Sequence, residues 1–201
     1  APEFKSDLLY RKESSNIYDS KGNLIATIGT EKRQLIKYNE LPQVLIDAII
    51  ATEDSRFFEH DGFDIPRFLK AGMSYVKGVD GGGASTLTMQ LSKNTFTSTE
   101  TKGFDGIVRK FTDIYMSIFK IEKDYSKEEI IEFYVNAPYL GAGSYGVEQA
   151  AKTYFGKDVT NLNLVEASVI AGMFQAPGEY DPYINPDKTT ARKNEVISLM
   201  L

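Results

Sequence analysis

A carboxylate-rich segment, residues 53–64, offers the clearest candidate for proton transfer. Glu53 follows Ile46 and Ile49 by seven and four residues, so on one helix its carboxylate would lie on the apolar face. A carboxylate held there is partly removed from water, which suits it to accept a proton. The alternative is that the helix ends near Glu53, and that the carboxylate caps it or pairs with Arg56.

A second segment combines glycines with hydroxyl, amide and lysine side chains. Residues 78–83 carry four glycines, and Ser85 or Thr86 can cap the helix that follows. Thr86, Gln90 and Lys93 are spaced by four and three residues, so they would share one polar helix face. Such groups suit a phosphate ligand. The alternative is a linker followed by a solvated helix face.

A third segment carries charge. Arg109 and Lys110 lie four and three residues before Asp113, so all three can meet on one side of a helix. Ile107, Phe111 and Ile114 are then expected to be buried on the other side. The alternative is a surface ladder of ion pairs, which contributes little to stability.

A short amphipathic helix is predicted between these segments, over residues 65–79. Its apolar face and its basic flank together suit a helix that lies on a membrane surface. A surface helix packed on the protein core would show the same pattern. The apolar residues are Ile65, Phe68, Leu69, Met73 and Val76, and the basic ones are Arg67, Lys70 and Lys77.

The elements that must position these groups are predicted to be mainly helical. Residues 16–36 are expected to form a strand, a turn and a second strand. Ser126 and Glu129 form a capping box, and Gly156 stops a helix. Apolar periodicity and end signals predict helices over 42–58, 65–78, 105–123, 126–136, 145–155, 163–176 and 185–201.

Composition sets outer limits on function. The chain has 201 residues, 42% of them hydrophobic and 25% charged, which is typical of a globular domain. The formal net charge of −5 argues against nucleic acid as a partner, and the absence of cysteine excludes disulfides and Cys-ligated zinc. Because His60 is the only histidine, multi-His metal sites are excluded, and we interpret it as a hydrogen-bonded structural residue. No stretch is long and apolar enough to span a membrane.

In this order along the chain, the motifs resemble the peptidoglycan glycosyltransferase domain, the transglycosylase of glycosyltransferase family 51. This lysozyme-like domain occurs in bifunctional class A penicillin-binding proteins and in monofunctional transglycosylases, and the chain looks more like the former. The first family motif is matched by Glu53, Asp54, Phe57, His60, Gly62 and Asp64, and the second by Gly83, Ala84, Ser85, Thr86, Thr88, Gln90, Lys93 and Asn94.

The later motifs follow with small departures. Asp113 stands where the third motif usually has Glu, after Arg109 and Lys110. The fourth motif is matched by Glu132, Tyr134, Asn136 and Gly141, and the fifth, basic one by Arg192 and Lys193.

The resemblance implies a reaction and a set of roles. Glu53 would be the catalytic base. Asp113 would be the second acidic residue of the catalytic site and would support the leaving group or a divalent metal, Mg or Mn, held by these two carboxylates, with no organic cofactor. The acceptor would be lipid II, and the donor a growing lipid-linked glycan chain that leaves undecaprenyl pyrophosphate with inversion. The substrate-binding residues would be Asp54, Arg56, Phe57, Ser85, Thr86, Gln90, Lys93, Arg109, Lys110 and Asn136.

The resemblance also implies an organisation and a location. Residues 1–13 would be a cloning remnant and linker, and 14–201 the catalytic domain, truncated at its C-terminus. Within it, 16–36 would be the β element, and 63–80 would face the membrane. The whole protein would be anchored by an N-terminal transmembrane helix on the extracytoplasmic face of the bacterial membrane, carry a transpeptidase domain after this one, and be a target of moenomycin.

Two other functions fit the same scaffold. A lysozyme-like peptidoglycan hydrolase would also use carboxylates beside a bound sugar chain. A non-catalytic cell-wall docking module would not need Glu53. The cationic set of Lys93, Arg109 and Lys110 favours the polymerase, because a glycosidase has no pyrophosphate to stabilise. A polymerase also needs a mobile flap, for which 78–83 is the expected base.

Overall fold

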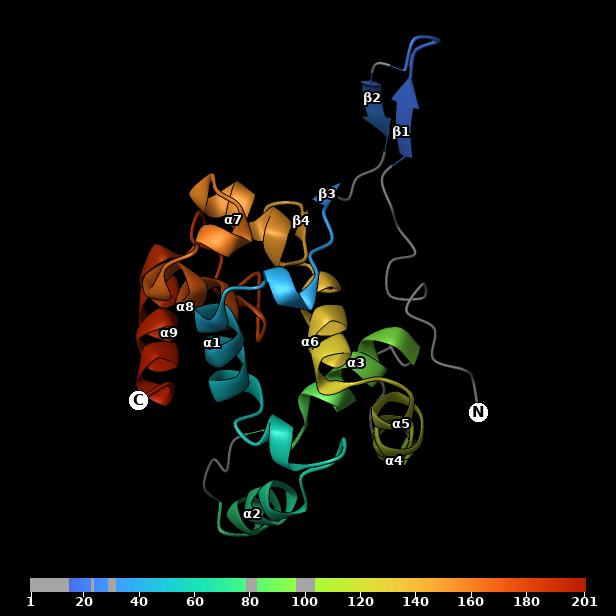
Figure 1. Ribbon diagram of the computed structural model, residues 1–201. Helices are drawn as coiled ribbons and strands as arrows, with labels where there is room; N and C mark the ends of the chain where they lie inside the picture. The colour runs from blue at the N-terminus through green and yellow to red at the C-terminus, as the bar shows by residue number, and fades with distance from the viewer. Residues whose placement is uncertain (1–14, 23, 29–31, 79–82, 97–103) are drawn as a thin grey trace. The chain divides into compact units, whose positions relative to one another are not determined.

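The computed structural model describes residues 15–22, 24–28, 32–78, 83–96 and 104–201 (Figure 1). The described residues are mainly helical, which confirms the predicted fold class of a lysozyme-like helical domain with a small β element. They form two compact units. The first contains residues 53–130, and the second combines 15–52 with 131–201.

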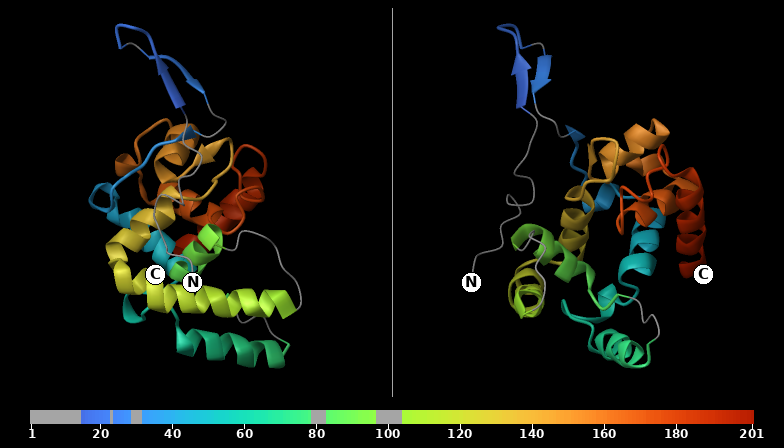
Figure 2. Two further views of the ribbon diagram at one scale, coloured as in Figure 1. Left: turned by 90° about the vertical axis from the view of Figure 1, so that its right-hand side faces the viewer. Right: turned by 180° about the vertical axis from the view of Figure 1, so that it is seen from behind.

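The first unit holds most of the predicted site, on short helices with defined starts. Asp64 begins α2 by accepting the Arg67 backbone N–H at 3.0 Å, and the Thr86 hydroxyl begins α3 by accepting the Met89 N–H at 3.2 Å. The elements are η3 (Phe57–Glu59), α2 (Ile65–Val76), α3 (Leu87–Phe96), α4 (Phe104–Met116), the π-helical η4 (Ser117–Ile121) and α5 (Glu122–Asp124). The last three run on as one long helix (Figure 2, left).

The second unit contains the β element and the remaining helices. Its strands are β1 (Ser15–Tyr18), β2 (Leu24–Ile28), β3 (Lys32–Arg33) and β4 (Ser144–Tyr145). Its helices are η2 (Tyr38–Glu40), α1 (Gln43–Glu53), α6 (Lys127–Asn136), α7 (Val147–Phe155), η5 (Val159–Asn161), α8 (Leu164–Met173) and α9 (Pro186–Leu199). Of these, α1 ends on the first residue of the first unit, and α6 begins in that unit.

Local end signals bound the helices of the second unit, and Gly156 stops α7 as predicted. Asn163 and Glu166 form a reciprocal capping box at the start of α8. Gly156 adopts the left-handed conformation, with φ of 67°, immediately after α7. Helices α8 and α9 pack closely, since a Cβ on Gly172 would lie 2.8 Å from the Arg192 Cγ.

Two predictions about the helices are wrong in part. The helix predicted over 42–58 ends at Glu53, because Asp54 turns its side chain inward and the chain continues as a 3₁₀ turn. Ile107 and Phe111, expected to be buried, are 55% and 68% exposed. The buried side of α4 instead holds Asp113 and Met116.

The β element also differs from the prediction. β1 and β2 form the expected antiparallel pair, with Ser15 opposite Ile28. Residues 34–36, however, are not in a strand, and β3 pairs in parallel with β4, more than 100 residues further along. A two-residue parallel pair has no local sequence signal, so the sequence did not predict it.

Two predicted segments lie wholly or mostly outside the residues that the structure describes. The predicted cloning remnant and linker at 1–13 lies outside the described residues, as does most of the predicted flap base at 78–83. Among the described residues, no helix has the length and apolarity needed to cross a bilayer.

Candidate active site

Glu53, the predicted base, is the last residue of α1 and is partly buried. Its carboxylate Oε2 accepts a hydrogen bond from the Gln90 side-chain amide at 3.0 Å, and its backbone carbonyl accepts one from Arg67 at 2.8 Å. The helix therefore ends at Glu53, as the alternative interpretation had it. Arg56 instead pairs with Glu59 and Asp64.

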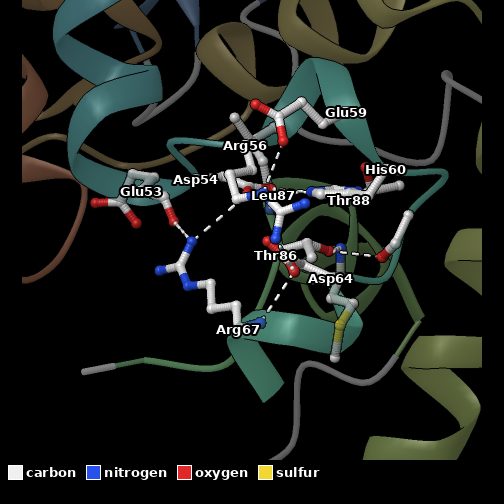
Figure 3. A network of polar contacts seen from close by, with 12 residues as sticks. Glu53, Asp54, Arg56, Glu59, His60, Asp64, Arg67, Thr86, Leu87 and Thr88 are labelled. Carbon is white, nitrogen blue, oxygen red and sulfur yellow. Dashed lines mark hydrogen bonds and ion pairs between the residues drawn. The ribbon is translucent and has the colours of Figure 1, made fainter. Parts of the chain in front are cut away.

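Asp54 lies at the centre of a buried polar network (Figure 3). Its Oδ2 accepts the Leu87 backbone N–H at 2.9 Å, which places a carboxylate at the N-terminus of α3. The His60 Nε2 lies 3.1 Å from each carboxylate oxygen of Asp54. Asp54 thus joins the first motif to the second, and His60 is hydrogen-bonded, as predicted, to Asp54 within the first motif.

Arg56 is more accessible than the buried Asp54 and Phe57 of the same motif. Its side chain is 41% exposed, and its Nε donates to Glu59 at 2.8 Å while NH1 donates to the buried Asp64 at 3.2 Å. The hydrogen bond to Glu59 raises the pKa of the Arg56 guanidinium above its usual range. Phe57, in contrast, is fully buried, with the Lys127 ammonium 4.3 Å from its ring centroid.

The second and third motifs meet at Lys110 and Ser85, where the Lys110 Nζ donates to the Ser85 hydroxyl at 2.5 Å. Burial lowers the pKa of Lys110, and the positive charges of Arg109 and Lys93 lower it further, while Asp113 acts in the opposite direction. The three cations are therefore close enough to act on one another. Such a cluster suits an anionic ligand.

Asp113 and Thr86 lie inside the first unit. The buried Asp113 carboxylate accepts from the Ser92 hydroxyl at 3.4 Å. The Thr86 hydroxyl is buried as well and donates to the Gly62 carbonyl at 2.7 Å. Gln90 and Lys93 are more exposed than Thr86, so the three do not share one solvated face.

Asn136, at the end of α6, belongs to the second unit. Its side-chain amide is buried and pairs with the backbone of Ile36 in both directions, at 2.8 and 2.9 Å. The neighbouring Glu132 accepts the Tyr38 backbone N–H at 2.9 Å. In this unit the fourth motif therefore holds the chain segment that precedes α1.

Two groups were missed by the sequence analysis. Arg67 bonds to the carbonyl of Glu53, and its only sequence signal was a place on the basic flank of α2. Glu122 accepts from the Thr88 hydroxyl at 2.5 Å and from Lys127 at 2.9 Å, and it was not singled out at all.

A divalent metal has one candidate set of ligands among the described residues. Asp54, His60 and Asp64 each offer a ligand atom, and these atoms all lie within 4.8 Å of one another. Both carboxylates, however, already accept hydrogen bonds from backbone N–H groups and contact an arginine. The set therefore fits a hydrogen-bonded network better than a metal centre, and it does not include the predicted ligands Glu53 and Asp113.

Comparison with known proteins identifies the family. The family model described as Transglycosylase matches residues 21–201. The chain belongs to the transglycosylase family. This confirms the prediction of a peptidoglycan glycosyltransferase domain similar to that of penicillin-binding proteins.

Individual relatives of this transglycosylase domain agree with that assignment. The chain is 40% identical over its full length to penicillin-binding protein 1A of Streptococcus oralis and spans 31% of that relative. It is 42% identical over 92% of its length to penicillin-binding protein 1A of Escherichia coli, of which it spans 21%. A crystal structure of penicillin-binding protein 1A from Haemophilus influenzae matches 94% of this chain and 18% of its own, with 27% identity and a TM-score of 0.51.

Proposed function

We propose that this transglycosylase domain polymerises lipid II into β-1,4-linked glycan strands, with inversion at the donor anomeric carbon and release of undecaprenyl pyrophosphate. The observation that carries the proposal is that Lys110 donates to Ser85 and is subject to the positive charges of Arg109 and Lys93, in the same unit as Glu53. A pyrophosphate leaving group requires such positive charge, whereas hydrolysis of a glycosidic bond does not.

Glu53 acts as the general base. Its carboxylate accepts the proton of the 4-hydroxyl of the lipid II N-acetylglucosamine while that oxygen attacks C1 of the donor N-acetylmuramic acid. The C1–oxygen bond to pyrophosphate breaks on the opposite face, so the α configuration becomes β. The hydrogen bond from Gln90 at 3.0 Å fixes the orientation of the carboxylate.

The leaving pyrophosphate is stabilised by cations of α3 and α4 in the same unit. Lys110 and Ser85 supply an ammonium and a hydroxyl that already face each other, and Arg109 and Lys93 add positive charge. Arg56, whose side chain is 41% exposed, is placed to hold a donor sugar or phosphate. Asp113 orients Lys110 electrostatically from the buried side of α4.

The expected Mg²⁺ or Mn²⁺ at Glu53 and Asp113 stays a prediction, and the proposed mechanism has no step through it. The Asp113 carboxylate is buried and accepts a hydrogen bond from Ser92. The positive charge of Lys110 already neutralises part of the negative charge of this carboxylate. A chelator titration of the polymerisation rate measures any contribution of an ion.

The full protein is proposed to be a larger, membrane-bound enzyme. The chain spans between about a fifth and a third of the length of the three relatives compared here. We propose that a transpeptidase domain follows it, that an N-terminal helix anchors it on the extracytoplasmic face, and that α2 contacts the bilayer. The exposed Ile65, Phe68, Leu69 and Met73 support this last contact.

The experiment measures glycan formation from labelled lipid II in detergent, comparing the parent chain with Glu53→Gln. We expect polymer from the parent and a loss of about 10³-fold or more in the folded variant, because the proton acceptor is removed. Glu128→Gln, an exposed carboxylate on α6, is the matched control and should polymerise like the parent.

Three results would contradict parts of the proposal. Polymer from Glu53→Gln at the parental rate would remove Glu53 as the base. Cleavage of preformed glycan by the parent would establish the hydrolase instead. Neither reaction from the folded parent would support the non-catalytic docking module.

A further inference from the structure

Arg67 connects three separate stretches of the first unit. From its place in the first turn of α2, its NH1 donates to the Glu53 carbonyl at 2.8 Å and lies 3.5 Å from the Asp54 carboxylate. Its Nε donates to the Gly83 carbonyl at 2.7 Å. Figure 3 shows the guanidinium reaching from α2 toward Glu53 and Asp54.

The bond to Glu53 replaces a partner that the helix cannot supply. The last carbonyls of an α-helix have no N–H from a following turn, and at Glu53 the helix α1 ends. A guanidinium satisfies such a carbonyl with a charged donor of fixed geometry. It therefore fixes the backbone from which the proposed catalytic carboxylate projects.

The bond to Gly83 acts on the other side of the site. Gly83 comes two residues before Ser85 and three before Thr86, the cap of α3. Holding the Gly83 carbonyl places this segment, and with it the start of the helix that carries Gln90. One side chain thus positions both the base and the residue bonded to it.

Arg67 is itself held in place. Its backbone N–H is bonded to Asp64, and Asp64 is bonded to Arg56, so the first turn of α2 is tied to the first motif. The buried Asp54 charge also attracts the guanidinium. The Arg67 side chain is 26% exposed, and its guanidinium donates to oxygens of Glu53, Asp54 and Gly83.

We propose that Arg67 is a positioning residue for glycosyl transfer, which sets the place of Glu53 through its main chain and that of Ser85 through Gly83. This rests on the proposed function. Because a displacement of about 1 Å at a reacting group can cost about 10²-fold in rate, loss of Arg67 should reduce turnover strongly. Substrate binding should change much less, since Arg67 acts through other residues.

The experiment compares Arg67→Ala and Arg67→Lys with the parent in the lipid II assay, and records the thermal midpoint of each. Lys123→Ala, which removes an exposed cation from α5, is the control for charge alone. We expect kcat to fall about 10- to 100-fold in Arg67→Ala with KM within about threefold. Arg67→Lys should be intermediate, and millimolar guanidinium should restore part of the rate of Arg67→Ala.

The outcomes separate the inference from the proposed function. An active parent with Arg67→Ala at full kcat would overturn the inference alone. So would a loss that follows the thermal midpoint and is not restored by guanidinium, because that is the result of a purely structural role. A folded parent without polymerase activity would overturn the proposed function and the inference with it.

Discussion

Lys110 combines burial, like charge and a close hydroxyl partner in one side chain. Burial lowers its pKa, the charges of Arg109 and Lys93 lower it further, and Asp113 partly compensates. Lys110 therefore loses its proton at a lower pH than an exposed lysine does. If its charge stabilises the leaving pyrophosphate, the polymerisation rate must fall on the alkaline side as that proton is lost.

Two substitutions should move this alkaline limb in opposite directions. Lys110→Arg keeps its charge to far higher pH, so the limb should move upward or disappear from the measured range. Asp113→Asn removes the opposing charge, so the pKa of Lys110 should fall further and the limb should move downward. Profiles of kcat/KM against pH from pH 6 to about 10 measure both shifts. An alkaline limb unchanged in both variants would mean that another group controls it.

At the scale of elements, the π-helical turn after α4 explains why position 62 requires a glycine. Gly62 has φ of 85°, and a Cβ there would lie 2.9 Å from the Ser117 backbone carbon in η4. Its carbonyl accepts the hydroxyl of Thr86, the cap of α3. The loop of the first motif is thereby packed against η4 and α3 at one glycine.

Gly62→Ala should therefore lower the free energy of unfolding by about 3 kcal/mol or more, from left-handed strain of about 1–2 kcal/mol plus the cost of overpacking. Chemical denaturation measures it. Gly156→Ala is the matched control, because its φ is also positive, at 67°, but apart from its chain neighbours no described heavy atom lies within 4 Å of the added Cβ. It should lose only the strain. Equal losses of unfolding free energy in the two variants would show that the clash of the added Cβ with η4 does not destabilise the protein.

Helix α2 presents an apolar face that the rest of the described protein leaves exposed. Replacing Leu69 and Met73, 57% and 59% exposed, by Glu should weaken binding to neutral lipid vesicles by about tenfold or more. Vesicle co-sedimentation measures the partition. Val165→Glu, an equally exposed apolar position on α8, is the control and should bind like the parent. Unchanged binding of the double variant would remove α2 from the membrane contact.

At the scale of the whole molecule, local sequence signals predict many of the helix ends. The remaining features depend on partners far along the chain, which the sequence pattern does not reveal. The starts of α8 and α9 and the end of α7 follow from caps, proline and glycine within a few residues, so the sequence predicts them. The end of α1 depends on Asp54 bonding to the backbone of Leu87, far along the chain. Arg67 was missed because two of its acceptors are backbone carbonyls, which leave no residue pattern.

The charge of the whole chain bears on how it meets a membrane. With 28 acidic and 23 basic residues, the formal net charge is −5, so long-range attraction to an anionic surface does not favour binding. The apolar face of α2 must then supply the main free energy of lipid contact. Burial of apolar surface does not depend on ionic screening, whereas attraction between charges does.

Binding to vesicles that contain anionic lipid should accordingly persist when salt rises from about 0.1 M to about 1 M, over which the screening length falls from about 10 Å to about 3 Å. We expect the partition coefficient to change by less than about threefold, or to rise, since salt also weakens repulsion within the acidic chain. Leu69→Glu in the same series should bind weakly at both salt concentrations. Release of the parent at high salt would instead assign the contact to the lysines beside the apolar face, Lys70 and Lys77, and would make charge the controlling interaction.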